Sequence, residues 1–205
     1  MNPLPVVHII SALPVGGVEQ NLLRVLPRLD RTRFRPSVVC LRERGDLAAA
    51  MEAAGVPVHL VRLRARYDPG SLWQLSRTLH TLEARVVHCH MRRANTSGRL
   101  AALLAGVPVR IATEHDMAID KSWRHLQVDR LLARVTDCIV AVSRAVAEIN
   151  ARRARISPDT FRVIYHGCTL DPARADLPSE EARRQLGLPA AGPLVGYVGR
   201  LHAIK

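Results

Sequence analysis

The sequence is poor in aromatic residues and has no long apolar stretch. Phe, Trp and Tyr make up only 3% of its 205 residues, too few for the aromatic platforms on which proteins stack single-stranded nucleic acids. Charge-free apolar stretches such as Leu100–Val109 fall far below the roughly 18 residues of a membrane-spanning helix. Residues 1–5 lack the basic and then apolar pattern of a secretory signal. We therefore expect no nucleic-acid partner, and a cytoplasmic protein that is at most peripheral to a membrane.

Cysteine pairs are also missing. The four cysteines have no CxxC spacing, and three of them fall within strand-like apolar runs, where cysteine acts as a small hydrophobic residue. They are Cys40, Cys89, Cys138 and Cys168. We expect free thiols and a reducing compartment.

Lysine is scarce, yet the chain is strongly basic. Only Lys121 and Lys205 among its 30 basic residues are lysines, and the formal net charge is +12. Such an excess of positive charge predicts an anionic partner. Phosphate and anionic lipid are the candidates, because the low aromatic content and the lack of a recognition motif argue against nucleic acid.

Apolar runs of strand length alternate with segments of helical periodicity along most of the chain. Strands are expected at Val6–Ile10, Ser37–Leu41, Val56–Val61, Val86–Cys89, Val109–Thr113, Cys138–Val142 and Phe161–Tyr165. Helices are expected at Val18–Leu29, Asp46–Ala54, Ser71–Leu82, Asn95–Ala105, Ser122–Arg134 and Ala145–Arg153. The alternation predicts an α/β fold with a parallel sheet covered by helices on both faces. Ligands of such sheets bind outside the carboxyl ends of the strands.

The character of the sequence changes after Gly167. We expect residues 1–168 to form one domain and residues 169–192 to form a proline-rich linker with a short helix at Ser179–Leu186. The apolar run Pro193–Leu201 predicts a further strand. A lone strand has no partner, so residues 193–205 are expected to begin a second domain that this sequence does not include.

Polar residues gather where the expected strands end. Gly16 and Gly17 stand between the first strand and the first helix, where backbone N–H groups can meet phosphate oxygens, although a tight turn alone would also explain them. The fourth to sixth strands end in His88 and His90, in Glu114, His115 and Asp116, and in Ser143. A zinc site from His88, His90 and His115 is an alternative that no cysteine pair or helical HxxxH motif supports. Ser143 also suits a helix N-cap, and no GxSxG motif favours a serine hydrolase.

Six short motifs stand in order at these element boundaries. They are "GGVEQ" (Gly16–Gln20), "VVHCH" (Val86–His90), "TEHD" (Thr113–Asp116), "IVAVS" (Ile139–Ser143), "VIYHGCTLD" (Val163–Asp171) and "VGRLHAIK" (Val198–Lys205). In this order they resemble the retaining glycosyltransferases of family 4, whose GT-B fold has two facing Rossmann-like domains. The resemblance covers nearly the whole chain and implies that this is the N-terminal, acceptor-side half. One departure is His166–Gly167, where the family usually has Asn-Gly.

The resemblance also implies roles for particular residues. Gly16 and Gly17 would contact the diphosphate of a nucleotide-sugar donor through backbone amides, and His115 would be the catalytic residue beside the transferred sugar. Arg200 and Lys205 would hold the diphosphate from the other domain. These cations stabilise a leaving diphosphate, so we expect neither a metal nor another cofactor. His90, Glu114, Asp116 and Ser143 are the further candidates for the sugar or acceptor side.

A basic segment follows the third expected strand. Arg62, Arg64 and Arg66, with Arg92 and Arg93 after the fourth strand, lie on the edge that often receives the acceptor in this family, which would be a glycan, a lipid or a small molecule. The alternative is a solvated loop whose arginines pair with carboxylates. The helix Ser122–Arg134 could lie on anionic lipid, but packing on the sheet is the simpler interpretation.

Three functions follow from these observations. The first is a sugar-nucleotide-dependent transferase that retains anomeric configuration, with this chain inactive by itself. The second is a non-catalytic binding module with the same fold. The third is a sugar-nucleotide epimerase.

Overall fold

The computed structural model describes residues 2–65, 67–117, 121–167 and 177–197. The chain divides into two compact units, Met1–His166 and Gly167–Lys205. The first unit contains the whole sheet, and the second contains the short helix α8 (Ser179–Gln185).

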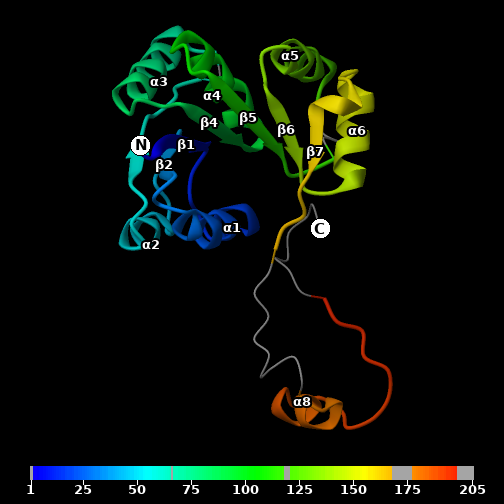
Figure 1. The fold of residues 1–205 in the computed structure, drawn as a ribbon. Coiled ribbons are helices and arrows are strands. Elements are labelled where there is room, and N and C mark those ends of the chain that lie inside the picture. Colours follow the sequence, from blue (N-terminus) through cyan, green and yellow to red (C-terminus); the bar gives the residue numbers. More distant parts are fainter. Residues whose placement is uncertain (1, 66, 118–120, 168–176, 198–205) are drawn as a thin grey trace. The chain divides into compact units, whose positions relative to one another are not determined.

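The first unit is built on a sheet of seven parallel strands, as the sequence predicted (Figure 1). The strands are β1 (Leu4–Ile10), β2 (Phe34–Cys40), β3 (Val58–Leu60), β4 (Val86–His90), β5 (Val109–Glu114), β6 (Cys138–Ala141) and β7 (Phe161–Val163). Their order is β3-β2-β1-β4-β5-β6-β7. The connections after β1 and β4 therefore diverge, which opens a crevice between the carboxyl ends of these two strands.

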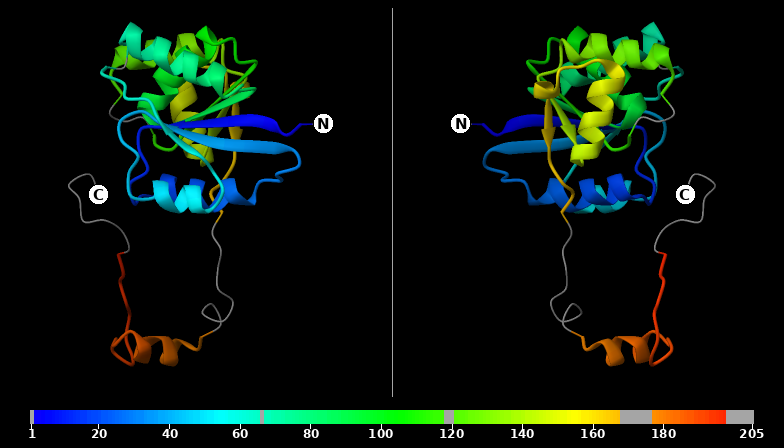
Figure 2. Two further views of the ribbon diagram at one scale, coloured as in Figure 1. Left: turned by 90° about the vertical axis from the view of Figure 1, so that its left-hand side faces the viewer. Right: turned by 90° about the vertical axis from the view of Figure 1, so that its right-hand side faces the viewer.

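Helices cover the two faces of the sheet unequally. They are α1 (Gly17–Val25), α2 (Ala48–Ala53), α3 (Pro69–Thr81), α4 (Met91–Leu104), α5 (Trp123–Ala133) and α6 (Arg144–Ala154), and a 3-10 turn, Leu26–Arg28, extends α1. The pair α1 and α2 lies on one face, and α3 to α6 lie on the other (Figure 2). The pair packs over β1 to β3, which leaves the β4–β7 half of its face without a covering helix among the described residues of the first unit.

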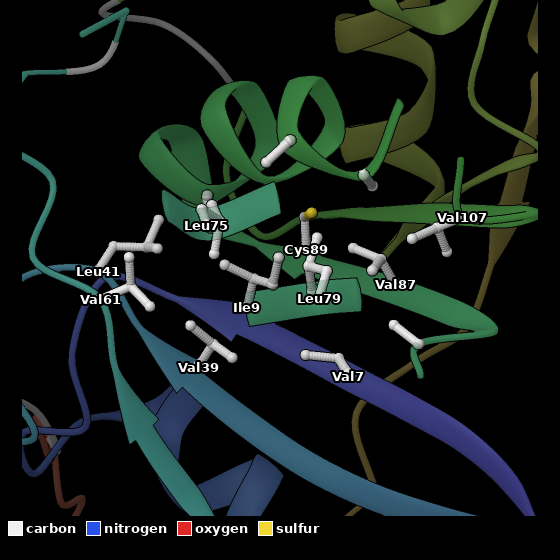
Figure 3. Packing of buried hydrophobic residues seen from close by; sticks show 14 of the residues in the cluster. Val7, Ile9, Val39, Leu41, Val61, Leu75, Leu79, Val87, Cys89 and Val107 are labelled. Atoms are coloured by element: carbon white, nitrogen blue, oxygen red, sulfur yellow. The ribbon is translucent and has the colours of Figure 1, made fainter. Parts of the chain in front are cut away.

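The core follows from the alternation of side chains along each buried strand. Val7 and Ile9 of β1 point to the face of α3, where they pack with Leu75 and Leu79 (Figure 3). Ile10 of β1 instead belongs to a second cluster on the opposite face, with Leu22, Leu26, Val38 and Met51. Each of these large side chains contributes about 1.5–3 kcal/mol when it leaves water, so both faces of the sheet's first half are held by packing.

Two backbone features fix the path of the chain after β4. Met91, the first residue of α4, has a left-handed φ of +69°, which costs a side-chain-bearing residue about 1–2 kcal/mol. Gly98 lets α4 lie close to the sheet, because a Cβ there would stand 2.6 Å from Sγ of Cys89. The helix α4 therefore begins directly after β4 and packs closely against that strand.

Most of the predicted elements are confirmed, with small shifts at their ends. All seven strands and six helices of the first unit form in the predicted order, and α4 begins four residues before the predicted Asn95. Cys40, Cys89 and Cys138 are free thiols, whereas Cys168 lies outside the described residues. In the part of the chain that the structure describes, no helix is both long enough and apolar enough to cross a bilayer.

The strand predicted at Pro193–Leu201, as the start of a second domain, stays a prediction. Residues 193–197 are irregular, and Val195 is fully exposed. A strand needs a hydrogen-bonded neighbour, and no strand of the described chain pairs with this segment. Apolar composition alone could not supply that partner.

Candidate functional site

A pocket of about 450 Å³ opens on the α1 side of the sheet, beside the crevice between β1 and β4. Its floor consists of side chains from β1, β4, β5 and β6, and its walls are α1 and the segment after β7. Most of its lining is aliphatic, including Leu22, Ile111, Val140 and Ile164. Its polar lining residues are Asn21, Thr113, Tyr165 and histidines, so the polar chemistry of the pocket is concentrated on imidazole groups.

Three of these imidazoles form a compact group, which we call the histidine cluster: His8, His88 and His90. Parallel pairing places His8 of β1 directly opposite His88 of β4. His88 and His90 share a face of β4, and their ring centroids lie 4.3 Å apart. Nδ1 of His8 and Nε2 of His90 are joined by a hydrogen bond of 3.0 Å. The sequence predicted the shared face of His88 and His90 but missed His8.

Burial keeps the histidine cluster neutral. It lowers the pKa of His8 to about 4, and it lowers the pKa of His88 and of His90 well below the ordinary value, with repulsion between the rings adding to the effect. Nε2 of His88 lies 2.6 Å from Oγ1 of Thr113. Nε2 of His8 and Nδ1 of His90 are buried and have no protein partner among the described residues. The cluster therefore offers imidazole nitrogens with free capacity.

His115 extends this row of rings along the pocket. Its ring lies 5.8 Å from that of His90 and stacks on His166 at 5.5 Å. Burial, with the nearby His166, lowers the pKa of His115 to about 4, so the ring is neutral near pH 7. Both of its nitrogens are buried without a partner among the described residues. Neutral imidazole with unused nitrogens is suited to hydrogen bonding with a hydroxyl group of a ligand.

Glu114, the neighbour of His115, points to the other face of the sheet. Lys121 donates hydrogen bonds to Glu114 at 3.0 Å and to Asp129 at 2.8 Å, and Asn95 donates to Glu114 at 3.1 Å. Arg99 pairs with Asp129 at 3.2 Å, which completes a buried group of two cations and two anions. Burial opposes the charge of Lys121, but the two carboxylates outweigh it and raise the pKa of this residue. Both oxygens of Glu114 are thus occupied, and the structure does not bring this residue to the pocket.

The glycine pair stands at the N-terminus of α1 with no side-chain cap. Gly16 is the N-cap in extended conformation, with φ −154°, and neither glycine has a positive φ. A Cβ on Gly16 would stand 2.3 Å from Oε2 of Glu19, whereas a Cβ on Gly17 would meet nothing within 4 Å. The turn therefore does not require glycine at position 17, where open space remains beside the first N–H groups of the helix.

Two of the other predicted site residues make hydrogen bonds with α6. Ser143 caps α6 by accepting a hydrogen bond of 3.2 Å from the Val146 N–H. The carbonyl group of Asp116 accepts a hydrogen bond of 2.9 Å from Asn150. Arg200 and Lys205, and Arg66 of the basic segment, lie outside the described residues.

The described part of the basic segment is open to solvent. Arg62 and Arg64 are exposed, and no ion pair joins either to a carboxylate within the described ranges. Arg93 instead donates a hydrogen bond of 2.9 Å to the carbonyl of Leu63, which ties this segment to α4. On α5, Leu132 is buried while Trp123 and Leu131 are exposed. The helix packs onto the protein along one side, as predicted, and leaves the tryptophan outside.

Comparison with known proteins places these features in a family. Residues 15–172 match the model of Glycosyltransferase Family 4. A UDP-Gal:alpha-D-GlcNAc-diphosphoundecaprenol alpha-1,3-galactosyltransferase of Escherichia coli is 24% identical over 97% of this chain and 54% of its own length. A D-inositol 3-phosphate glycosyltransferase of Acidothermus cellulolyticus is 29% identical over 98% of this chain and 46% of its own. The chain thus spans about half the length of these curated relatives.

The fold agrees with this match. The crystal structure of Anabaena Alr3699/HepE in complex with UDP superimposes with a TM-score of 0.72 at 19% identity, over 90% of this chain and 50% of that one. The seven-stranded sheet is therefore the Rossmann-like half of a GT-B structure. Because the family model matches most of the chain, from the glycine pair to the segment after β7, this protein belongs to glycosyltransferase family 4.

Proposed function

We propose that this chain is the N-terminal, acceptor-side half of a retaining glycosyltransferase that moves a sugar from a nucleotide-sugar donor. The observation that carries the proposal is the position of His115, with both ring nitrogens unused, in a pocket whose wall is the helix opened by Gly16 and Gly17. A sugar hydroxyl can hydrogen-bond to that ring. The free N–H groups of α1 can receive the donor diphosphate.

The proposed reaction depends on stabilising the leaving nucleoside diphosphate. Negative charge grows on that group as the glycosidic bond breaks, so N–H dipoles and cations aimed at it lower the barrier. In this proposal Gly16 and Gly17 supply the dipoles, and Arg200 and Lys205 supply the cations. Donor turnover would then need no metal ion at the diphosphate.

We further propose that the acceptor carries phosphate. Two relatives are named for D-inositol 3-phosphate and for a diphosphoundecaprenol acceptor. Exposed Arg62 and Arg64 have no ion-pair partner among the described residues and follow β3 at the carboxyl edge of the sheet. Exposed arginines without a carboxylate partner are suited to phosphate, because a guanidinium group can bind phosphate through two parallel hydrogen bonds.

The experiment is a transfer assay with a panel of nucleotide sugars and phosphorylated acceptors. It uses the protein that contains this chain together with a GT-B donor domain. His115→Ala should lower kcat/KM by at least about a hundredfold, equivalent to about 2.7 kcal/mol of transition-state stabilisation. His80→Ala, which removes an exposed imidazole on α3, is the matched control and should leave activity unchanged.

Three results would contradict the proposal. Equal activity of the His115→Ala variant and the control would remove His115 from the reaction. Turnover by the 205-residue chain alone would show that no donor domain is needed. If the protein binds a sugar nucleotide or an acceptor but no pair of donor and acceptor in the panel gives transfer, the non-catalytic binding module is favoured.

A further inference from the structure

The histidine cluster has features that sugar transfer does not explain. Its three imidazoles come from two adjacent strands, so the backbone ladder of the sheet fixes their spacing. One nitrogen of each ring lies within 4.8 Å of one nitrogen of each other ring. We propose that His8, His88 and His90 form a binding site for a divalent transition-metal ion of the zinc class.

The donor set fits such an ion. Imidazole nitrogen binds Zn²⁺, Co²⁺, Ni²⁺ and Cu²⁺, whereas Mg²⁺ and Ca²⁺ require oxygen ligands, which the cluster does not offer. Metal binding needs neutral imidazole, and burial holds all three rings in that form. No acidic side chain belongs to this group in the described chain, so the site would carry the full charge of the ion.

The distances require only small movements. With metal–nitrogen bonds of about 2.0–2.1 Å, neighbouring ligand atoms of a tetrahedral ion lie about 3.4 Å apart. The His8–His90 pair, at 3.0 Å, is already near that separation, and the ring of His88 would turn inward by about an ångström. The pocket beside them offers about 450 Å³ for this movement.

Thr113 provides the outer support that such sites need. A ligating histidine usually donates its second ring N–H to a neighbouring acceptor, which fixes the tautomer and the ring plane. Oγ1 of Thr113 lies 2.6 Å from Nε2 of His88 and can be that acceptor. This assigns Nδ1 of His88 to the ion.

The site would be open on one side. Three protein ligands leave one position of a tetrahedral ion free, and all three residues line the pocket. That position would therefore face the pocket and take a water molecule or a ligand hydroxyl. This ion would not sit at the donor diphosphate, where the proposed function requires no metal.

The test is a Co²⁺ titration of the full chain, with any affinity tag removed. One equivalent should give a visible ligand-field absorption without a thiolate charge-transfer band, and Zn²⁺ should displace it. His88→Ala and His8→Phe, which keeps a ring at position 8, should each weaken binding by at least about tenfold, equivalent to about 1.4 kcal/mol. Thr113→Val should weaken it by about tenfold or more while removing no ligand. The exposed His80→Ala is the matched control and should bind as the wild type does.

A second measurement does not depend on the folding of variants. An ion that binds only the native cluster must raise the thermal unfolding temperature of the wild-type chain. We expect that rise with Zn²⁺ and its reversal by a chelator. The proposal is overturned if Co²⁺ gives no spectrum and Zn²⁺ no stabilisation, or if folded His8→Phe and His88→Ala bind as tightly as the wild type.

Discussion

Replacing Lys121 by methionine should unfold this protein at a much lower temperature. The side chain of Lys121 is 3% exposed, and its ammonium group bridges two carboxylates whose side chains are 10% and 12% exposed. In the Lys121→Met variant, Asp129 keeps Arg99 at 3.2 Å, but Glu114 keeps only the amide of Asn95. Removing one partner of a buried ion pair costs about 3–5 kcal/mol.

The assay is thermal and urea unfolding of the 205-residue chain at pH 7.5. A loss of 3–5 kcal/mol corresponds to a drop in Tm of about 6–20 °C for a protein of this size. Glu52→Gln is the control, because it breaks an ion pair with Arg44 whose side chains are 44% and 42% exposed. That pair should contribute less than about 1 kcal/mol.

A double variant tests the cause of the loss. Lys121→Met with Glu114→Gln removes the stranded charge and should recover part of the stability, since neighbouring residues are coupled. If Lys121→Met lowers Tm no more than Glu52→Gln does, the buried charges contribute nothing beyond an exposed pair. Burial of these charges would then not be what makes Lys121 important for stability.

Three further predictions concern the site. The variant Gly17→Ala, in the protein that contains this chain together with a donor domain, should keep or raise Tm, because its Cβ meets nothing within 4 Å. It should nevertheless lower kcat/KM by at least about tenfold. Unchanged kcat/KM would contradict the assignment of Gly17 to the diphosphate. Alanine at Arg62, Arg64 and Arg66 together should weaken sedimentation with anionic vesicles by about 1 kcal/mol per residue, and unchanged binding would leave these arginines merely solvated. With EDTA present, unfolding free energy should fall between pH 7.5 and pH 5. Burial lowers the pKa of His8 from 6.5 to about 4, so as the pH falls the unfolded chain binds a proton at this residue before the folded chain does. His8 alone then accounts for about 2 kcal/mol of the loss. An unfolding free energy that does not change between these pH values would contradict the burial of His8.

The fold could be predicted because each strand carries its own signal. Runs such as Val38–Leu41 are apolar on both faces, which only a sheet covered on both sides can bury. The order of β1 and β4 in the sheet has no such local signal, because it depends on how distant segments pair. His8 was missed for that reason: its importance comes from standing opposite His88.

The candidate site was predicted in part. Strand ends identified His90 and His115 because parallel strands bring their carboxyl ends to one edge. The same rule misplaced Glu114, since successive residues of a strand point to opposite faces, and this carboxylate lies with Lys121 behind the sheet. Lys121 itself stands in an irregular stretch just before α5, where no periodicity could reveal its burial.

The pairing of β1 with β4 also bears on how the chain folds during synthesis. Val6 pairs with Val86, so one edge of β1 has no neighbour until β4 leaves the ribosome. At roughly 5–20 residues per second, that interval is on the order of several seconds. During that time β1 can pair only with β2, and its other edge has no partner strand. The unpaired edge of this apolar strand is then open to other nascent chains. Folding yield should therefore depend on the rate of translation between β3 and β4 more than on any later segment.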